Sequence, residues 1–151
     1  MTEKFSTTLP RPAELLPHQD AMLLIDTVVT VDENHAVAES VVKRSWPMAR
    51  AAGVSSLLAI ELAAQTIGIC NIWGLMQTHG ENTNKNGWLV AIKKAVFYTD
   101  LLPFAATLTI RAENGFAFDT FREATGWVYQ GETLIAEIMT QTYQAETSRR
   151  T

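Results

Sequence analysis

Basic residues and cysteine are both scarce in this chain of 151 residues. Twelve Lys and Arg stand against sixteen Asp and Glu, which gives a formal charge of −4, and no basic run is longer than a pair. Nucleic-acid binding needs a clustered basic face that neutralises phosphates, so the sequence disfavours it. The single cysteine, Cys70, excludes an intramolecular disulfide and suits a reducing cytoplasm.

Targeting, membrane and metal signals are also missing. Residues 1–6 read Met-Thr-Glu-Lys-Phe-Ser, which lacks the apolar segment of a secretory signal. The one long apolar stretch, Val54 to Met76, is interrupted by Glu61, Gln65 and Asn71, as in a buried helix and unlike a membrane span. No two of the three histidines have metal-ligand spacing. We therefore expect a soluble cytoplasmic protein without a membrane segment, metal or cofactor.

The composition predicts a single globular domain. Hydrophobic residues make up 47% and charged residues 19% of the sequence, and neither a linker nor an internal repeat divides it. A chain of this length buries enough apolar surface to fold without disulfides. We expect one domain over residues 1–151, with an ordered core from about residue 12 to residue 145.

The first third of the chain predicts one helical turn and two strands. Residues 12–16 begin with proline, which suits the first turn of a helix, and Pro17 should end it. Residues 22–31 are apolar and β-branched toward their end, which predicts a buried strand. Residues 35–43 then form an antiparallel return.

A long helix should follow. Between Ala51 and Gly80 the only charged residue is Glu61, and the Ala, Leu and Met content favours helix over strand. Ser55 or Ser56 would cap the first turn, and His79-Gly80 would end the helix. A helix that is apolar on all sides must be buried on nearly all of them.

The remainder reads as antiparallel strands. Residues 88–98 are predicted as strand, and Leu101-Leu102-Pro103 interrupts the pattern. Residues 106–113 alternate strictly, and Asn114-Gly115 is a strong signal for a type I′ hairpin that returns over 116–129. A second turn at residues 130–132 leads into a last strand. The predicted fold is therefore α+β, with an antiparallel β-sheet wrapped around one long central α-helix.

Several short motifs in their order along the chain resemble one known family. The matching segments are Leu15-Leu16-Pro17-His18-Gln19 with Met22-Leu23-Leu24-Ile25-Asp26, Gly53 with Ile60-Glu61-Leu62-Ala63-Ala64-Gln65, Ile92-Lys93-Lys94-Ala95-Val96-Phe97, and the hairpin around Gly131. They resemble the hotdog-fold dehydratases that act on 3-hydroxyacyl groups carried by acyl carrier protein. The chain is most similar to the small dehydratase-like branch of aryl-polyene pigment clusters. The resemblance covers about residues 15 to 143.

The resemblance implies a paired protein with shared active sites. In that family two subunits lie side by side, and the helix glutamate of one subunit faces a histidine of the other. Glu61 corresponds to the glutamate. The histidine usually stands in a Gly-His-Phe-Pro loop before the helix, where this chain reads Arg44-Ser45-Trp46-Pro47, so the histidine half of the pair is missing.

Glu61 is the best catalytic candidate, because a lone carboxyl in an apolar segment is costly unless it has a function. Dehydration needs a group that removes the C2 proton and one that protonates the departing hydroxyl. His18, the only histidine in a matching motif, is the second catalytic candidate, with a positioning role as the alternative. Gln65, one helical turn from Glu61, would hydrogen-bond either Glu61 or the thioester carbonyl.

The helix start is the predicted place for the thioester oxygen. The backbone N–H groups near Gly53 and Val54 would bind that oxygen, because a helix N-terminus favours developing negative charge. Glycine would let the substrate approach closely.

Three functions stay open at this point. The first is a 3-hydroxyacyl-thioester dehydratase, with the acyl group on acyl carrier protein or coenzyme A. The second is a hotdog thioesterase, in which the helix carboxylate activates water. The third is a non-catalytic subunit that pairs with a histidine-bearing hotdog dehydratase. We expect either a homodimer or a heterodimer with another hotdog subunit.

Overall fold

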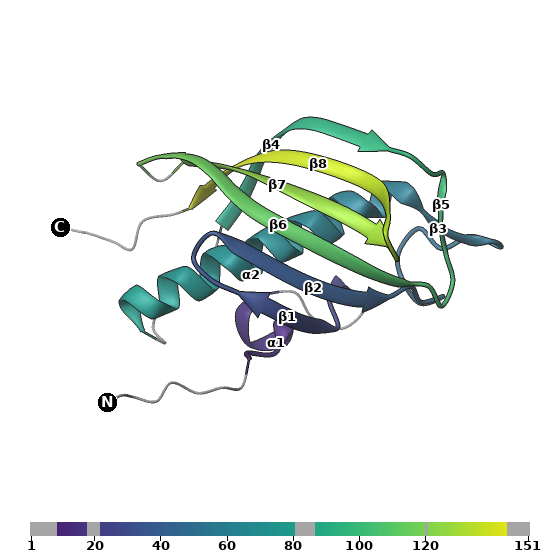
Figure 1. The fold of residues 1–151 in the computed structure, drawn as a ribbon, viewed down its shortest axis with the longest axis horizontal. Coiled ribbons are helices and arrows are strands. Elements are labelled where there is room, and N and C mark those ends of the chain that lie inside the picture. The colour runs from purple at the N-terminus through teal and green to yellow at the C-terminus, as the bar shows by residue number, and fades with distance from the viewer. Residues whose placement is uncertain (1–8, 18–21, 81–86, 120, 145–151) are drawn as a thin grey trace.

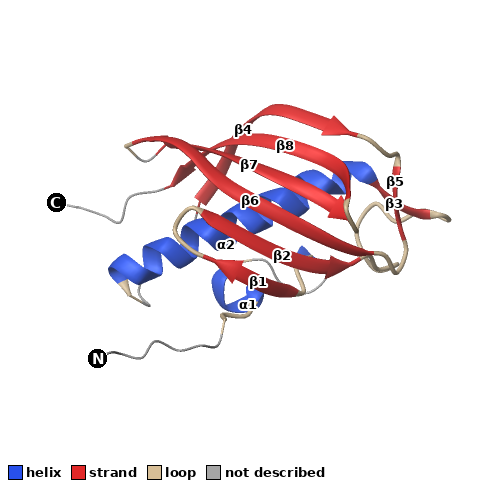
Figure 2. Ribbon diagram, in the orientation of Figure 1, coloured by secondary structure: helices blue, strands red, loops and turns tan. Residues whose placement is uncertain are grey.

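The computed structural model describes residues 9–17, 22–80, 87–119 and 121–144. One curved antiparallel sheet covers the long helix α2 (Ala59–His79) (Figure 1). The short helix α1 (Pro12–Leu15) contacts α2. Figure 2 shows that α2 is the single long helix of this described part and that strands make up most of the rest. The predicted α+β class and the central helix packed against a sheet are confirmed.

The main sheet has six strands in the order β1-β2-β6-β7-β8-β4, and all neighbours are antiparallel. The strands are β1 (Thr27–Val31), β2 (His35–Val41), β4 (Gly87–Phe97), β6 (Thr107–Phe118), β7 (Phe121–Gln130) and β8 (Thr133–Gln144). A separate two-stranded sheet joins β3 (Gly53–Ser55) to β5 (Leu101–Pro103). It lies next to the beginning of α2 (Figure 1).

The helix begins and ends as its sequence predicts. Ser55 Oγ accepts a hydrogen bond from Leu57 N at 3.3 Å and caps the 3₁₀ turn η2 (Ser56–Leu58), which leads directly into α2. Gly80 ends the helix with φ at 81°, and its N–H donates to Met76 O at 2.9 Å. Glycine adopts this conformation without the steric cost of a Cβ atom.

The core lies between α2 and the concave face of the sheet. Ala63 packs so closely on β7 that a Cβ atom at Gly126 would lie 2.6 Å from Ala63 Cβ. The segment Ser56–Thr78 has the length and composition of a membrane span, but more than half of it is buried inside this fold. One side of α2, at Ile60, Glu61 and Ala64, is only half-buried in the single chain, so the expectation of burial on nearly every side is not fully met.

Three local expectations are wrong. The strand expected over 22–31 begins only at Thr27, because the Leu24 backbone bonds side chains instead of a neighbouring strand. The hairpin expected at Asn114-Gly115 is absent: β6 continues to Phe118 with an irregular register after Asn114. Residues 101–103 do not interrupt the β structure, since they pair with β3.

Candidate functional site

Gln65 is the best-fixed polar side chain of the site. It is 1% exposed, and its Oε1 accepts a hydrogen bond from Leu24 N at 3.0 Å. Its Nε2 donates to Met22 O at 2.7 Å and to Glu61 Oε2 at 2.9 Å. Both amide hydrogens are then used. The bond to Glu61, one of the two predicted, is present, and in this arrangement the amide has no hydrogen left for a thioester carbonyl.

Glu61 lies half-buried in the first turn of α2. The bond from Gln65 fixes one carboxylate oxygen, and Gln65 is in turn held by residues 22–24 of the chain. Ser40 Oγ donates to Leu24 O at 2.8 Å, so β2 supports the same segment. The candidate carboxylate is therefore oriented by a chain of hydrogen bonds from the sheet, which is how a reactive side chain is kept in one geometry.

Gly53 and Val54 were expected at the helix start, but they lie in strand β3. Val54 pairs with Leu102, and a Cβ atom at Gly53 would lie 2.6 Å from Leu102 O. The close approach that requires glycine here is thus made by the β5 backbone. Both residues are buried, and their predicted contact with the thioester oxygen stays a prediction.

The loop that carries the histidine in the resembling family is filled here by an apolar residue. Trp46 is 5% exposed and belongs to the main core. Its backbone N–H donates to Lys43 O at 3.1 Å. Lys43 Nζ forms an ion pair of 2.9 Å with Asp26. Ser45 beside the tryptophan is exposed. The loop is anchored but offers no imidazole to Glu61.

His18 lies outside the described residues, so its distance to Glu61 is not part of this structure. His35, the first residue of the predicted return strand, is exposed at the beginning of β2. Within the described segments, no group of three His, Cys, Asp or Glu side chains has the arrangement of a metal site.

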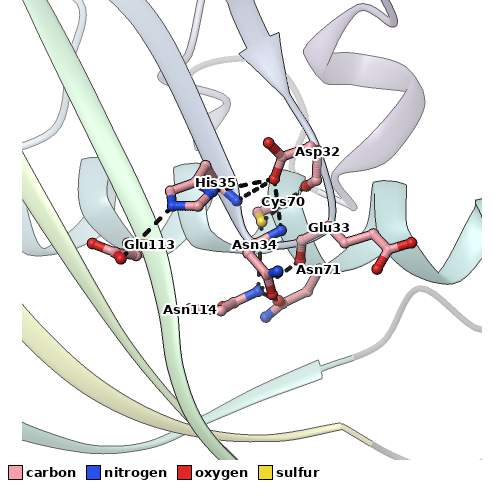
Figure 3. A network of polar contacts seen from close by, with 8 residues as sticks. All are labelled: Asp32, Glu33, Asn34, His35, Cys70, Asn71, Glu113 and Asn114. Atoms are coloured by element: carbon pink, nitrogen blue, oxygen red, sulfur yellow. Dashed lines mark hydrogen bonds and ion pairs between the residues drawn. The ribbon is translucent and has the colours of Figure 1, made fainter.

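A second polar cluster, missed by the sequence reasoning, lies farther along α2 (Figure 3). Asn114 Nδ2 donates to Asn71 Oδ1 at 2.9 Å and to Glu33 O at 3.1 Å. Arg122 Nη1 also donates to Asn71 Oδ1, at 3.4 Å. These contacts join residues 43, 51 and 81 positions apart, and no local motif signals them.

Two ionisable groups at this cluster have shifted pKa values. Burial raises the pKa of the Cys70 thiol to about 12, and the Asp32 carboxylate adds to the shift. Hydrogen bonds from the backbone of Asn34 and His35 lower the pKa of Asp32. The thiol thus stays protonated, and Cys70 is not a nucleophile at neutral pH.

Comparison with known proteins supports the architecture. Residues 10–151 match the family model described as ApeP-like, ApeP dehydratase. A search of curated proteins gives no match. The solved Dehydratase Heterocomplex ApeI:P from Xenorhabdus doucetiae aligns with a TM-score of 0.80 and 21% identity over 93% of this chain and 94% of that one.

Two further structures share the fold at lower similarity. The PaaI protein of Escherichia coli, from an operon of phenylacetic acid degradation, aligns with a TM-score of 0.60 and 14% identity over 78% of this chain and 82% of that chain. A hypothetical thioesterase with coenzyme A from Streptococcus pneumoniae aligns with a TM-score of 0.62 and 11% identity over 81% and 87%. At these identities the likeness concerns the fold, and the predicted hotdog fold is confirmed.

Proposed function

The chain belongs to the ApeP-like dehydratase family, and on this premise we propose that it is a subunit of a cytoplasmic 3-hydroxyacyl-[acyl carrier protein] dehydratase of fatty-acid or aryl-polyene biosynthesis. The observation that carries the proposal is Glu61, a half-buried carboxylate on the core helix that is oriented by the buried amide of Gln65. Glu61 is its catalytic carboxylate.

The reaction removes water across C2 and C3 of the acyl chain. A base takes the C2 proton, the C3–O bond breaks, and an acid protonates the departing hydroxyl. Glu61 supplies one of these two groups. In the described part of the chain no imidazole lies in hydrogen-bond contact with Glu61, so the second group comes from His18 or from another subunit.

We favour a partner subunit that carries the missing loop histidine. The likeness to a chain of a dehydratase heterocomplex supports this choice. The long edge strand β4 supports it too, because an unprotected edge of this length is a template for pairing with another chain. Lys93 and Lys94 of this strand form ion pairs with Glu123 and Glu137 of the same sheet.

The test is to express the full chain alone and together with a histidine-bearing hotdog subunit encoded beside it. Each preparation is incubated with a 3-hydroxyacyl carrier protein and with the matching coenzyme A thioester, and products are identified by mass spectrometry. We expect enoyl product from the pair, with a roughly 10²–10⁴-fold loss in Glu61→Gln. Glu39→Gln, an exposed carboxylate on β2, is the matched control and should keep full activity.

Each other outcome selects a different function. Full activity of the pair containing Glu61→Gln would make this chain a non-catalytic subunit. Release of free acid and thiol would identify a thioesterase. Activity of the homodimer that disappears in His18→Gln would place both catalytic groups in this chain.

A further inference from the structure

The chain turns away from the sheet just before β1. The register of β1 with β2 pairs Thr27 with Glu39, and a continued ladder would place residue 25 opposite Val41. The Asp26 carboxylate takes the place of that backbone partner, because its Oδ2 accepts a hydrogen bond from Val41 N at 2.8 Å. Lys43 Nζ binds the same carboxylate at 2.9 Å. The backbone before Asp26 is thus free to leave the sheet, and Val41 N is still satisfied.

Ser40 places a buried hydroxyl on the inner face of β2. The side chains of Ala36, Ala38 and Ser40 alternate toward the core, and Ser40 is 1% exposed. Its Oγ donates to Leu24 O at 2.8 Å, which uses the one hydrogen of the hydroxyl. An alanine would continue the pattern of this face without the desolvation of a polar group. Packing alone therefore does not account for the hydroxyl.

The segment that Ser40 fixes carries the two backbone groups that hold Gln65. Leu24 N donates to Gln65 Oε1 at 3.0 Å, and Met22 O accepts from Gln65 Nε2 at 2.7 Å. A backbone N–H can only donate and a backbone carbonyl can only accept, so these two bonds decide which end of the amide carries the oxygen. The other hydrogen of Nε2 then meets Glu61 Oε2 at 2.9 Å. Ser40 and Glu61 are the two ends of one series of hydrogen bonds.

A second buried hydroxyl of the same sheet lacks this connection. Thr140 on β8 is fully buried, and its Oγ1 donates to Ala124 O at 3.3 Å. That carbonyl belongs to β7, which is already paired with β8. Leu24 O belongs to a segment without a neighbouring strand, so its position depends on side chains. Thr140 is therefore the natural comparison for Ser40.

We propose that Ser40 is a positioning residue for the reaction at Glu61, and that it acts only through the backbone of residues 22–24 and the Gln65 amide. The inference rests on the proposed function and adds to it a residue that does not touch the substrate. Without the hydroxyl, Leu24 O has no partner and the segment shifts. The amide then no longer directs its N–H at Glu61 Oε2, and the carboxylate leaves its productive orientation. Binding of the acyl thioester is not affected.

The experiment measures kcat and KM separately for dehydration of a 3-hydroxyacyl carrier protein by the full chain with its hotdog partner. We expect Ser40→Ala to lower kcat about tenfold and to leave KM within about twofold of wild type. Ser40→Thr keeps the hydroxyl and should recover most of kcat. Thr140→Val removes a buried hydroxyl of the same sheet and should leave both constants within about twofold.

A double-mutant cycle tests the route of the effect. If Ser40 acts only through Gln65, adding Ser40→Ala to Gln65→Met should change kcat by less than about twofold. If Ser40→Ala does not fold, Ser40→Cys takes its place and should lower kcat about threefold, because a thiol is a weaker donor. If the double variant does not fold, the comparison of Ser40→Ala with Thr140→Val decides.

The contrary outcomes are distinct. A wild-type pair that forms no enoyl product would overturn the proposed function and this inference with it. If the pair is active and Glu61→Gln is not, equal kcat values in Ser40→Ala and Thr140→Val would overturn the inference alone. A further tenfold fall in kcat on the Gln65→Met background would also overturn it, because Ser40 would then act by another route. An unchanged kcat with a raised KM would assign Ser40 to substrate binding and overturn its positioning role.

Discussion

Gln65 Nε2 donates a hydrogen bond of 2.9 Å to Glu61 Oε2, one turn away on the same helix. The same amide bonds the backbone of Met22 and Leu24, residues that are more than forty positions away in sequence. The segment before β1 and the candidate catalytic carboxylate are therefore positioned by one side chain. Stability and activity should both respond to its loss.

Replacing Gln65 by methionine tests this relationship. The change keeps the volume but leaves the buried Leu24 N and the part-buried Met22 O without their partners. We expect the free energy of unfolding to fall by about 2–4 kcal/mol in urea titrations. Gln77→Met, at an exposed position of α2, should stay within about 0.5 kcal/mol of wild type. Equal stabilities of the two variants would contradict a buried network at Gln65.

Gly53 and Gly74 should respond to alanine with opposite signs. A Cβ atom at Gly53 would lie 2.6 Å from Leu102 O and force β3 away from β5, so Gly53→Ala should destabilise the fold by about 1–3 kcal/mol. At Gly74 the nearest atom lies 3.9 Å away within a helix, so Gly74→Ala should stabilise it by up to about 1 kcal/mol. Thermal unfolding measures both, and a stabilised Gly53→Ala variant would exclude the close contact.

The sequence predicts those elements whose signals are local. The apolar run with Glu61, the cap at Ser55 and the stop at Gly80 define α2 without tertiary information. The turn at Gly131, where φ is 63°, follows the same logic. The contact between Glu61 and Gln65 could be predicted from the sequence, because side chains four positions apart lie on the same face of a helix.

The wrong predictions arise where contacts between residues far apart in the sequence determine the local structure. Asn114-Gly115 has the composition of a tight turn, but the Asn114 side chain is engaged by Asn71 and Glu33, and the strand passes through to a turn at Asp119. The polar cluster was missed for the same reason, since Arg122 meets Asn71 only after β6, β7 and α2 have packed.

Cys70 should make stability fall at alkaline pH. The pKa of its thiol is about 12 in the folded protein and 9.0 ordinarily, so between these values the unfolded chain has lost a proton that the folded one keeps. Stability therefore decreases as pH rises through this window, by up to about 1.4 kcal/mol per pH unit. From pH 8 to pH 10.5 the wild type should lose about 2 kcal/mol more than Cys70→Ala. If the free energies of unfolding of the two proteins fell in parallel with pH, the pKa of the thiol would not be raised by folding.

Replacing Ala105 by glycine should stabilise the protein, although an alanine-to-glycine change within a strand destabilises it. Its φ of 68° places its backbone in the left-handed region, where the Cβ atom crowds the carbonyl oxygen at a cost of about 1–2 kcal/mol. Glycine removes this strain, and the greater freedom of the unfolded chain takes back about 0.4–1 kcal/mol. Ala105→Gly should thus raise the free energy of unfolding by about 0.5–1 kcal/mol. Ala117→Gly, at an exposed position of β6, has only the entropic cost and should lower it. Denaturant titrations in which both variants lose stability would mean that the turn after β5 does not hold Ala105 in the left-handed conformation.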